Sequence, residues 1–245
     1  MSPDSAKIKL SDIDEERFGI RTAKSSCTTR EDIPELLEFC EAHQVELLIA
    51  RCPAADIEAV QRMERHGFFI TDTLVYYSFF LKNKPIPEDA AGIRVRPVSP
   101  GEEFVVKDIA QGSFQGYRGH YHADPRLDRK KCDDVYTDWA YRSCFRGSLA
   151  NEVMVAEYDS TPAGFATLRI NSDSEGEGVL FGVAPVFQGK GIYRSLMIGG
   201  LTWCVSLGLD VMIVSTQIVN TAVQKVWTRL GFEPSHSYYT FHKWF

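Results

Sequence analysis

The feature that constrains this chain most is a stretch that occurs twice. "RHGFFITDTLVYYSFFL" (65–81) and "RLGFEPSHSYYTFHKWF" (229–245) share a Gly-Phe step followed by a strand-like run rich in Tyr and Phe. Gly67 and Gly231 lie 164 positions apart, and each ends a predicted amphipathic helix, at 57–65 and 222–230, as a C-cap would. A short apolar run, VELLIAR or DVMIVST, precedes each helix. The repeat predicts two related α/β units, although Gly-Phe after a helix is common enough for the likeness to arise by chance.

The best boundary between the two units is NKPIPEDAAG, where two prolines remove backbone donors. We therefore expect an N-terminal domain at 1–84, a linker at 85–92 and a second domain at 93–245. The second domain reads as a strand, a helical and irregular stretch, a tight hairpin, and then alternating strands and helices, with a last strand at 237–244. This order predicts an α/β fold of the α+β type, with a mixed, mostly antiparallel central sheet flanked by helices.

Charge and composition exclude several classes of protein. The formal net charge of −6 gives no electrostatic basis for binding nucleic acid. No apolar run is long enough to cross a membrane, and the first residues are too polar for a signal peptide. The six cysteines have no metal-ligand spacing, and we interpret them as reduced thiols. We expect a cytoplasmic protein that binds no nucleic acid, no membrane and no metal.

The stretch "VAPVFQGKGIYRSL" (183–196) ends an apolar strand, turns through two glycines and enters a helix. It is not a nucleotide-binding P-loop, because Lys190 is followed by Gly191 instead of Ser or Thr, and it lacks the third glycine of a dinucleotide fingerprint. The free N–H groups of such a turn suit an anion such as a pyrophosphate. The alternative is a glycine-rich surface turn with no ligand.

Together with "NTAVQKVWTRLGF" (220–232), this stretch resembles the GNAT acyltransferase superfamily. Val183 and Pro185 fit the strand end of the family pattern, and Asn220 fits the start of the later helix. The resemblance implies acetyl-CoA as cosubstrate, with its pantetheine arm along the strand at Val183, whose amide would bind the oxyanion. It also makes the N-terminal domain a truncated GNAT-like unit. The implied cofactor-binding residues are Phe181, Gly182, Val183, Gln188, Gly189, Lys190, Gly191, Ile192, Tyr193, Asn220 and Trp227.

The main departure from the family pattern is Trp227, which stands where the family usually has a tyrosine that protonates the departing thiolate. An indole N–H is a hydrogen-bond donor but not a usable acid. Tyr238 and Tyr239 on the last strand are the replacement acids that we predict, and strand alternation favours only one of them. Tyr193 at the helix start is a third phenol near the expected thiol, but we expect it to give its amide to the phosphates and its ring to packing. Glu177 shares a strand face with Val183 and is the predicted base, the alternative being a solvated edge glutamate.

The acceptor site is predicted in "FQGYRGHYHAD", where Tyr117, Arg118, His120 and His122 could bind substrate. The alternative is a polar surface loop. The layout of this region resembles the TDP-fucosamine acetyltransferases, which implies an amino-sugar nucleotide as acceptor.

The first unit has no glycine between Cys27 and Val45, so it should not bind CoA. "RFGIRTAKSS" (17–26) could form an edge of the acceptor pocket, a plain structural role being the favoured alternative.

The sequence therefore predicts an N-acetyltransferase that moves an acetyl group directly from acetyl-CoA to a primary amine of a small acceptor, in a chain that could form a homodimer. Two alternatives stay open. One is a catalytically impaired acyl-CoA sensor whose acid was lost to Trp227. The other is an N-acetyltransferase of a protein, peptide or aminoglycoside. Release of CoA thiol in the presence of an amine would distinguish the small-molecule acetyltransferase from the sensor. The size of the acceptor would distinguish it from the peptide acetyltransferase.

Overall fold

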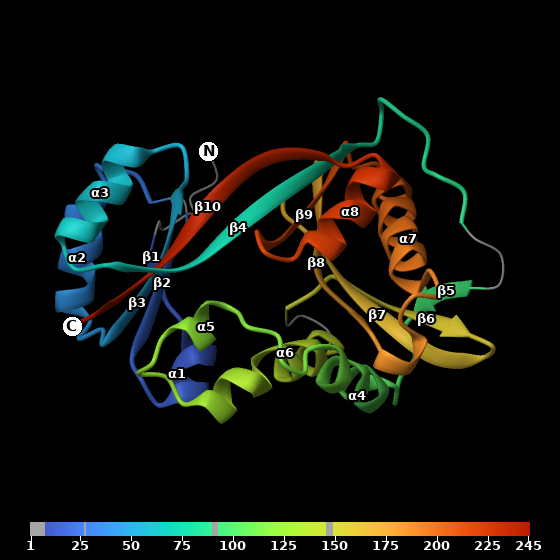
Figure 1. The fold of residues 1–245 in the computed structure, drawn as a ribbon, viewed down its shortest axis with the longest axis horizontal. Coiled ribbons are helices and arrows are strands. Elements are labelled where there is room, and N and C mark those ends of the chain that lie inside the picture. Colours follow the sequence, from blue (N-terminus) through green and yellow to red (C-terminus); the bar gives the residue numbers. More distant parts are fainter. Residues whose placement is uncertain (1–7, 27, 90–92, 146–148) are drawn as a thin grey trace.

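A computed structural model describes residues 8–26, 28–89, 93–145 and 149–245 (Figure 1). The elements of the first unit are β1 (Ile8–Leu10), α1 (Asp12–Phe18), β2 (Thr22–Ser25), α2 (Ile33–Ala42), β3 (Leu47–Pro53), α3 (Ile57–Arg65) and β4 (Phe69–Phe80). Those of the second are β5 (Ile93–Pro97), α4 (Glu103–Ser113), α5 (His120–Ala123), α6 (Arg129–Ser143), β6 (Glu152–Tyr158), β7 (Thr161–Ile170), β8 (Glu175–Val183), the 3₁₀ turn η1 (Pro185–Phe187), α7 (Ile192–Ser206), β9 (Val211–Gln217), α8 (Thr221–Leu230) and β10 (Glu233–Trp244).

In the described part of the chain, ten strands form one continuous sheet in the order β1-β2-β3-β10-β4-β9-β8-β7-β6-β5. Only β2 with β3 and β8 with β9 pair in parallel; the other neighbours there are antiparallel. The predicted fold class, a mixed and mostly antiparallel sheet flanked by helices, is confirmed.

The last strand of each unit lies inside the other unit's part of the sheet. Strand β4 separates β10 from β9, and β10 separates β3 from β4 (Figure 1). The strand register repeats with the offset of 164 seen in the sequence. Pro53 pairs with Tyr238, and Leu74 pairs with Gln217. Gln217 is the position equivalent to Pro53, and Tyr238 is the position equivalent to Leu74, so the two pairs are equivalent. The strands that follow the two Gly-Phe steps, β4 and β10, are therefore equivalent and lie antiparallel beside each other.

Strand β10 begins at Glu233, four residues before the predicted start of the last strand. The sequence Glu-Pro-Ser-His disfavours a strand, yet these residues pair with the end of β4. The register shifts between Pro234 and His236, and such a bulge tolerates a proline that cannot donate to the ladder.

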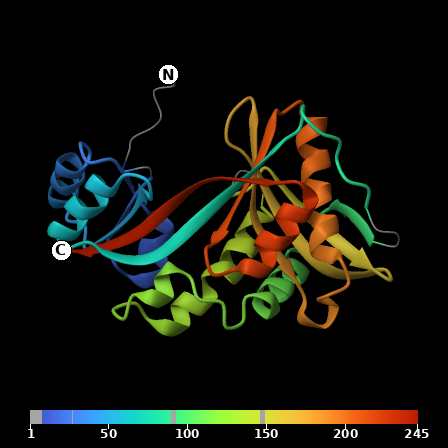
Figure 2. The same ribbon diagram turned by 45° about the horizontal axis from the view of Figure 1, so that its top comes forward.

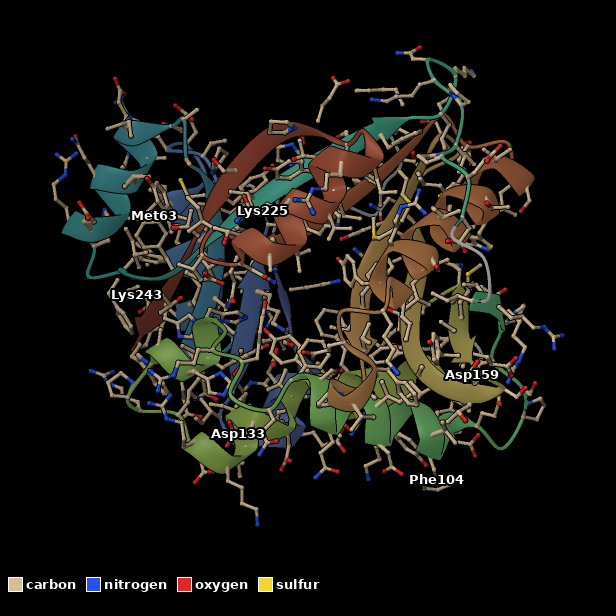
Figure 3. The ribbon with its side chains drawn as sticks, turned by 45° about the vertical axis from the view of Figure 1, so that its right-hand side comes forward. Met63, Phe104, Asp133, Asp159, Lys225 and Lys243 are labelled. Atoms are coloured by element: carbon tan, nitrogen blue, oxygen red, sulfur yellow. The ribbon has the colours of Figure 1, made fainter. Side chains whose placement is uncertain are left out.

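Helices cover both faces of the sheet. On one face α7 and α8 pack on the second unit, with Leu201 and Trp227 against Met212 of β9, and α2 and α3 pack on the first. On the other face α1, α4, α5 and α6 form a layer that runs along both units (Figure 2). In Figure 3, Lys225 on α8 and Asp133 on α6 mark the two sides.

The division into domains 1–84 and 93–245 stays a prediction, and residues 90–92 of the predicted linker lie outside the described residues, as does Cys27. In the parts of the chain that the structure describes, we find no helix that is both long and apolar enough to span a membrane.

Candidate active site

Strands β8 and β9 run side by side only along their first halves. Their parallel register ends at the pair Gly178 and Val214, whereas the strands continue to Val183 and Gln217. The register of β8 with β7 skips Val179, an extra residue of the kind that bends a strand. The two strands therefore splay and leave a gap in the middle of the sheet.

The backbone of Val183 faces this gap. Val183 pairs with Gly164 of β7, and the next amide, that of Ala184, donates to the carbonyl of Ala163 at 2.9 Å. Such a bond makes Val183 and Gly164 a non-hydrogen-bonded pair, in which the N–H and C=O of Val183 point away from β7. The side-chain amide of Gln188 lies 3.5 Å from the Val183 carbonyl. The gap thus has one N–H donor aimed into it by the strand itself.

The glycine turn connects β8 to α7. Gly189 and Gly191 have φ values of 78° and 85°, a left-handed conformation that favours glycine, and Gly191 caps the helix. Ile192 anchors the start of α7 in the core, at 1% exposure. The first N–H groups of a helix have no partner within it, so they can bind an anion. Lys190 is exposed, with its ammonium 4.5 Å from the centre of the Tyr158 ring.

A cavity of about 470 Å³ passes through the gap. On the α7 and α8 side it is lined by Phe181, Tyr193, Asn220 and Trp227. On the side of α5 and α6 it is lined by Tyr117, His120 and Tyr136, and from the first unit by Lys9, Lys24, Ser26, Arg51 and Asp72. One space therefore joins the two faces of the sheet.

A hydrogen-bonded pair of aromatic side chains forms the α7 and α8 wall. The indole Nε1–H of Trp227, which is 2% exposed, donates to the hydroxyl oxygen of Tyr193 at 3.0 Å. Burial raises the pKa of Tyr193, so its phenol keeps its proton at neutral pH. The Tyr193 hydroxyl thus receives one hydrogen bond and can donate another.

The opposite wall is aromatic and polar. Tyr117 packs edge-on against Tyr136, with 5.0 Å between ring centres, and burial raises the pKa of Tyr117 to about 12. His120 at the start of α5 forms a 2.9 Å hydrogen bond from its Nδ1 to Nε2 of His242. Asp72 also lines this wall, and its burial raises the pKa of its carboxyl group.

Comparison with known proteins identifies the arrangement. Residues 114–232, which contain the splayed strands, the glycine turn and α8, match the model of the acetyltransferase (GNAT) family. The chain carries a GNAT acetyltransferase domain. It is accordingly an enzyme of the acyltransferase class, and the resemblance to the GNAT superfamily predicted from the sequence is confirmed.

Three similar proteins illustrate the relationship. The spore coat polysaccharide biosynthesis protein SpsD of Bacillus subtilis is 25% identical over 206 residues, which cover 82% of this chain and 68% of SpsD. A mycothiol acetyltransferase of Amycolatopsis mediterranei is 33% identical over 158 residues, 61% of this chain and 48% of that protein. The chain thus spans about half of that relative. The crystal structure of a GCN5-related N-acetyltransferase from Sphaerobacter thermophilus superimposes with a TM-score of 0.63 at 15% identity, over 97% of this chain and 76% of that one, which shows the shared fold.

Enzymes of the GNAT family use acetyl-CoA, and the residues of this domain fit that cosubstrate. A side chain at Gly182 would collide with the Phe165 ring, so the strand backbone stays bare beside the gap. Asn220 caps α8 and donates from Nδ2 to the Thr216 hydroxyl at 3.0 Å. Phe181, Gly182 and Val183 thus lie along the gap, and the turn lies at its end, in the order that the resemblance implied.

The predicted catalytic residues lie in three different environments. The Glu177 carboxylate lines the cavity but accepts hydrogen bonds from Arg169 at 2.5 Å and Asn171 at 3.1 Å. Both bonds go to the same oxygen, Oε2, which is therefore already engaged by neighbouring side chains. Tyr238 is on the cavity face of β10, because it pairs with Leu74, but its ring packs on Tyr76.

Tyr239 points to the opposite face of β10 and packs in the core beneath α2 and α3. The prediction that it is catalytic is therefore corrected: β10 crosses the first unit with its odd-numbered residues turned toward that core, away from the cavity.

The predicted acceptor residues separate in the same way. Tyr117 and His120 line the cavity. The Arg118 side chain is exposed, and its backbone carbonyl accepts a 2.7 Å hydrogen bond from the Gln217 side chain. His122 is buried on the far side of α5, between the Gly119 amide and Asp133. The geometry therefore argues against a substrate contact through the side chains of Arg118 and His122.

Sequence reasoning missed Arg51 of the first unit and His242, which lies behind His120. It included Asp124 in the polar cluster of the acceptor region but not as a partner of His242. Lys24 lies in the stretch 17–26, the possible acceptor edge that we ranked below a structural role. Among the described residues, no group of three or more His, Cys, Asp and Glu side chains is arranged to hold a metal ion.

Proposed function

We propose that this enzyme transfers an acetyl group from acetyl-CoA to a primary amine of a small, anionic acceptor, with an amino-sugar nucleotide as the best candidate. The observation that carries the proposal is the single cavity that passes through the gap between β8 and β9. A donor on one side of the sheet and an acceptor on the other can meet there at the amide of Val183, without a covalent enzyme intermediate.

On the donor side, acetyl-CoA supplies an activated thioester. The N–H of Val183 is aimed where the carbonyl oxygen gains negative charge, and a donor so placed is typically worth about 2.7–4 kcal/mol of barrier. The sulfur needs a proton as it leaves, because a thiol has a pKa near 8.5. Tyr193 can donate that proton, with the Trp227 N–H stabilising the phenolate that remains. In this assignment Trp227 positions the acid that stands in for the family tyrosine.

On the acceptor side, the cavity is closed by the first unit, since β1, β2, β3 and β4 all contribute to its lining. A capped pocket supports a small acceptor, whereas a peptide would need an open groove. Its lining has four cations, Lys9, Lys24, Arg51 and Arg169, against two carboxylates, Asp72 and Glu177, in a chain whose net charge is −6. Even with the buried Asp14 carboxylate that pairs with Lys24, the cations outnumber the carboxylates by one. This local positive excess favours an anionic acceptor.

An amino-sugar nucleotide has the features that this wall suits: phosphates for Lys24 and Arg51, and rings for stacking on Tyr117 and Tyr136. The relative SpsD is named for the biosynthesis of a spore coat polysaccharide, which agrees with a sugar acceptor. The match covers 82% of this chain, so it extends beyond residues 114–232, which match the GNAT family model.

The test is release of CoA thiol from acetyl-CoA with each of three acceptor classes: TDP-amino sugars, aminoglycosides and peptides, against a blank without acceptor. Release with a TDP-amino sugar alone supports the proposal. Release only with an uncharged peptide or with a cationic aminoglycoside would contradict the anionic acceptor. Binding of acetyl-CoA with no release in any arm would favour an acyl-CoA sensor. The cytoplasmic location and the homodimer stay predictions, to be checked by fractionation and by light scattering.

A further inference from the structure

A chain of hydrogen bonds leads from the cavity into the protein interior. His120, at the cavity wall, bonds through Nδ1 to Nε2 of His242 at 2.9 Å, and His242 bonds through Nδ1 to Oδ2 of Asp124 at 2.7 Å. His242 is 0% exposed and Asp124 is 2% exposed. The chain joins α5 to β10, and the predicted functional residues do not account for it.

The hydrogen bonds to Asp124 fix its charge. Besides His242, the Trp244 indole donates to Oδ2 at 2.9 Å and the Arg126 amide donates to Oδ1 at 3.0 Å. An indole N–H and a backbone N–H can only donate, so the carboxyl group serves as acceptor on both oxygens. Although burial raises the pKa of Asp124, the bonds from His242, Arg126 and Trp244 hold it below its ordinary value. Asp124 is therefore a carboxylate.

The carboxylate sets the tautomers of both histidines. Because Asp124 only accepts, Nδ1 of His242 carries a proton, and in the neutral ring Nε2 is then an acceptor. Nδ1 of His120 must in turn carry the proton that it donates to His242. The remaining nitrogen of His120, Nε2, is left with a lone pair.

The groups that face His120 keep its ring neutral. Lys24 of β2, Arg51 of β3 and His242 of β10 surround it, with His122 on its own helix. Burial first, and then these groups, lower the pKa of His120 well below 6.5. At neutral pH the lone pair is therefore available.

We propose that His120 is the general base that accepts the proton of the acceptor amine, and that His242 and Asp124 are positioning residues which hold its Nε2 free. This rests on the proposed function. As the neutral amine nitrogen bonds to the thioester carbon, its proton passes to Nε2 of His120. The carbon–sulfur bond breaks with its electron pair on sulfur, which takes the proton of Tyr193.

The charge that His120 gains can move inward. The proton on its Nδ1 can shift to Nε2 of His242, so that the positive charge comes to lie beside the Asp124 carboxylate. Solvent then carries a proton from the histidine pair back to the Tyr193 phenolate, and the enzyme is restored.

The deciding measurement is ¹⁵N NMR of the imidazole nitrogens in the free protein at pH 7, with the His120 signals assigned by their loss in His120→Gln. We expect Nδ1 of both His120 and His242 to be protonated and Nε2 of His120 to be bare. A proton on Nε2 of His120 would overturn the assignment even if acetyl transfer is observed. Because this measurement needs neither acceptor nor acetyl-CoA, its result is independent of whether the proposed function holds.

A kinetic arm uses TDP-4-amino-4,6-dideoxygalactose as acceptor. His120→Gln should lower kcat about 10²- to 10⁴-fold at pH 7, the usual contribution of a general base, while acetyl-CoA affinity stays unchanged. Asp124→Asn can donate to His242 and reverse both tautomers, so it should lower kcat and move the His120 proton to Nε2. His66→Gln, an exposed histidine on the outer surface, is the matched control. A His120→Gln enzyme with the wild-type kcat would refute the base.

Discussion

Replacing Tyr193 with phenylalanine removes one oxygen atom, and the structure gives the size of two effects. The Trp227 N–H, on a side chain that is 2% exposed, loses the acceptor that lies 3.0 Å away. An unpaired buried donor costs about 1–3 kcal/mol of folding free energy. If Tyr193 also supplies the proton for the leaving sulfur, kcat should fall about 10²- to 10⁴-fold.

The assay separates the acid from a packing role. Thiol release would be measured with acetyl-CoA and with a thioester of a more acidic thiol, which leaves without protonation. Tyr193→Phe should be severely slowed with the first donor and much less with the second, at unchanged acetyl-CoA affinity. Burial raises the Tyr193 pKa above 10, the ordinary value for tyrosine, so the wild-type rate should fall only at pH values above 10. This fall at alkaline pH should be absent in the variant.

A double-mutant cycle gives the control. Trp227→Phe alone loses the hydrogen bond, and the pair Tyr193→Phe with Trp227→Phe should show a coupling in unfolding free energy of about 0.5–3 kcal/mol. If Tyr193→Phe releases CoA at the wild-type rate from both donors, Tyr193 is not the acid.

Three further predictions follow from the described contacts. Gly182→Ala forces a methyl group against the Phe165 ring, so calorimetry should show weaker acetyl-CoA binding, and thermal melts a loss of about 1–3 kcal/mol typical of overpacking; an unchanged affinity would argue against a bare strand at this point. Arg51→Met should raise the KM for a TDP-amino sugar while Arg30→Met, on the exposed surface, should not; equal KM values in both would remove Arg51 from the acceptor site. Arg96 donates two hydrogen bonds of 2.7 Å to Glu102 and holds the Glu102 pKa at about 2, below its ordinary 4.5. This pair therefore stabilises the fold above pH 4.5, and the stabilisation is lost as the pH falls toward 2. In urea melts, the difference in unfolding free energy between wild type and Glu102→Gln should shrink over that range, and a constant difference would disprove the linkage.

The elements could be predicted because their signals are local. Gly231 ends α8 in a left-handed conformation, and the predicted helix 57–65 coincides with α3, whose Asp56 cap accepts from the Ala59 amide at 3.0 Å. The donor half of the site was predictable for the same reason, since Val183, the glycine turn and α8 follow one another within fifty residues of sequence.

Only part of the acceptor half could be predicted, namely Tyr117 and His120, because distant segments meet there. Whether Tyr238 or Tyr239 faces the cavity depends on the register of β10 against β3 and β4, which no local pattern sets. Arg51 reaches the cavity because β3 lies beside β10. His242 looks like one more residue of an aromatic strand until α5 places His120 against it.

The reciprocal placement of β4 and β10 makes the two units mechanically inseparable, even though a single covalent segment joins them in sequence. A protein cut between β4 and β5 would give two pieces, each carrying the strand that fills a vacancy in the other. Alone, each piece would present long unpaired strand edges, which favour aggregation. Produced together, the pieces have a template for assembling the sheet in trans, as in a split reporter, and the acceptor pocket would exist only in the reassembled pair.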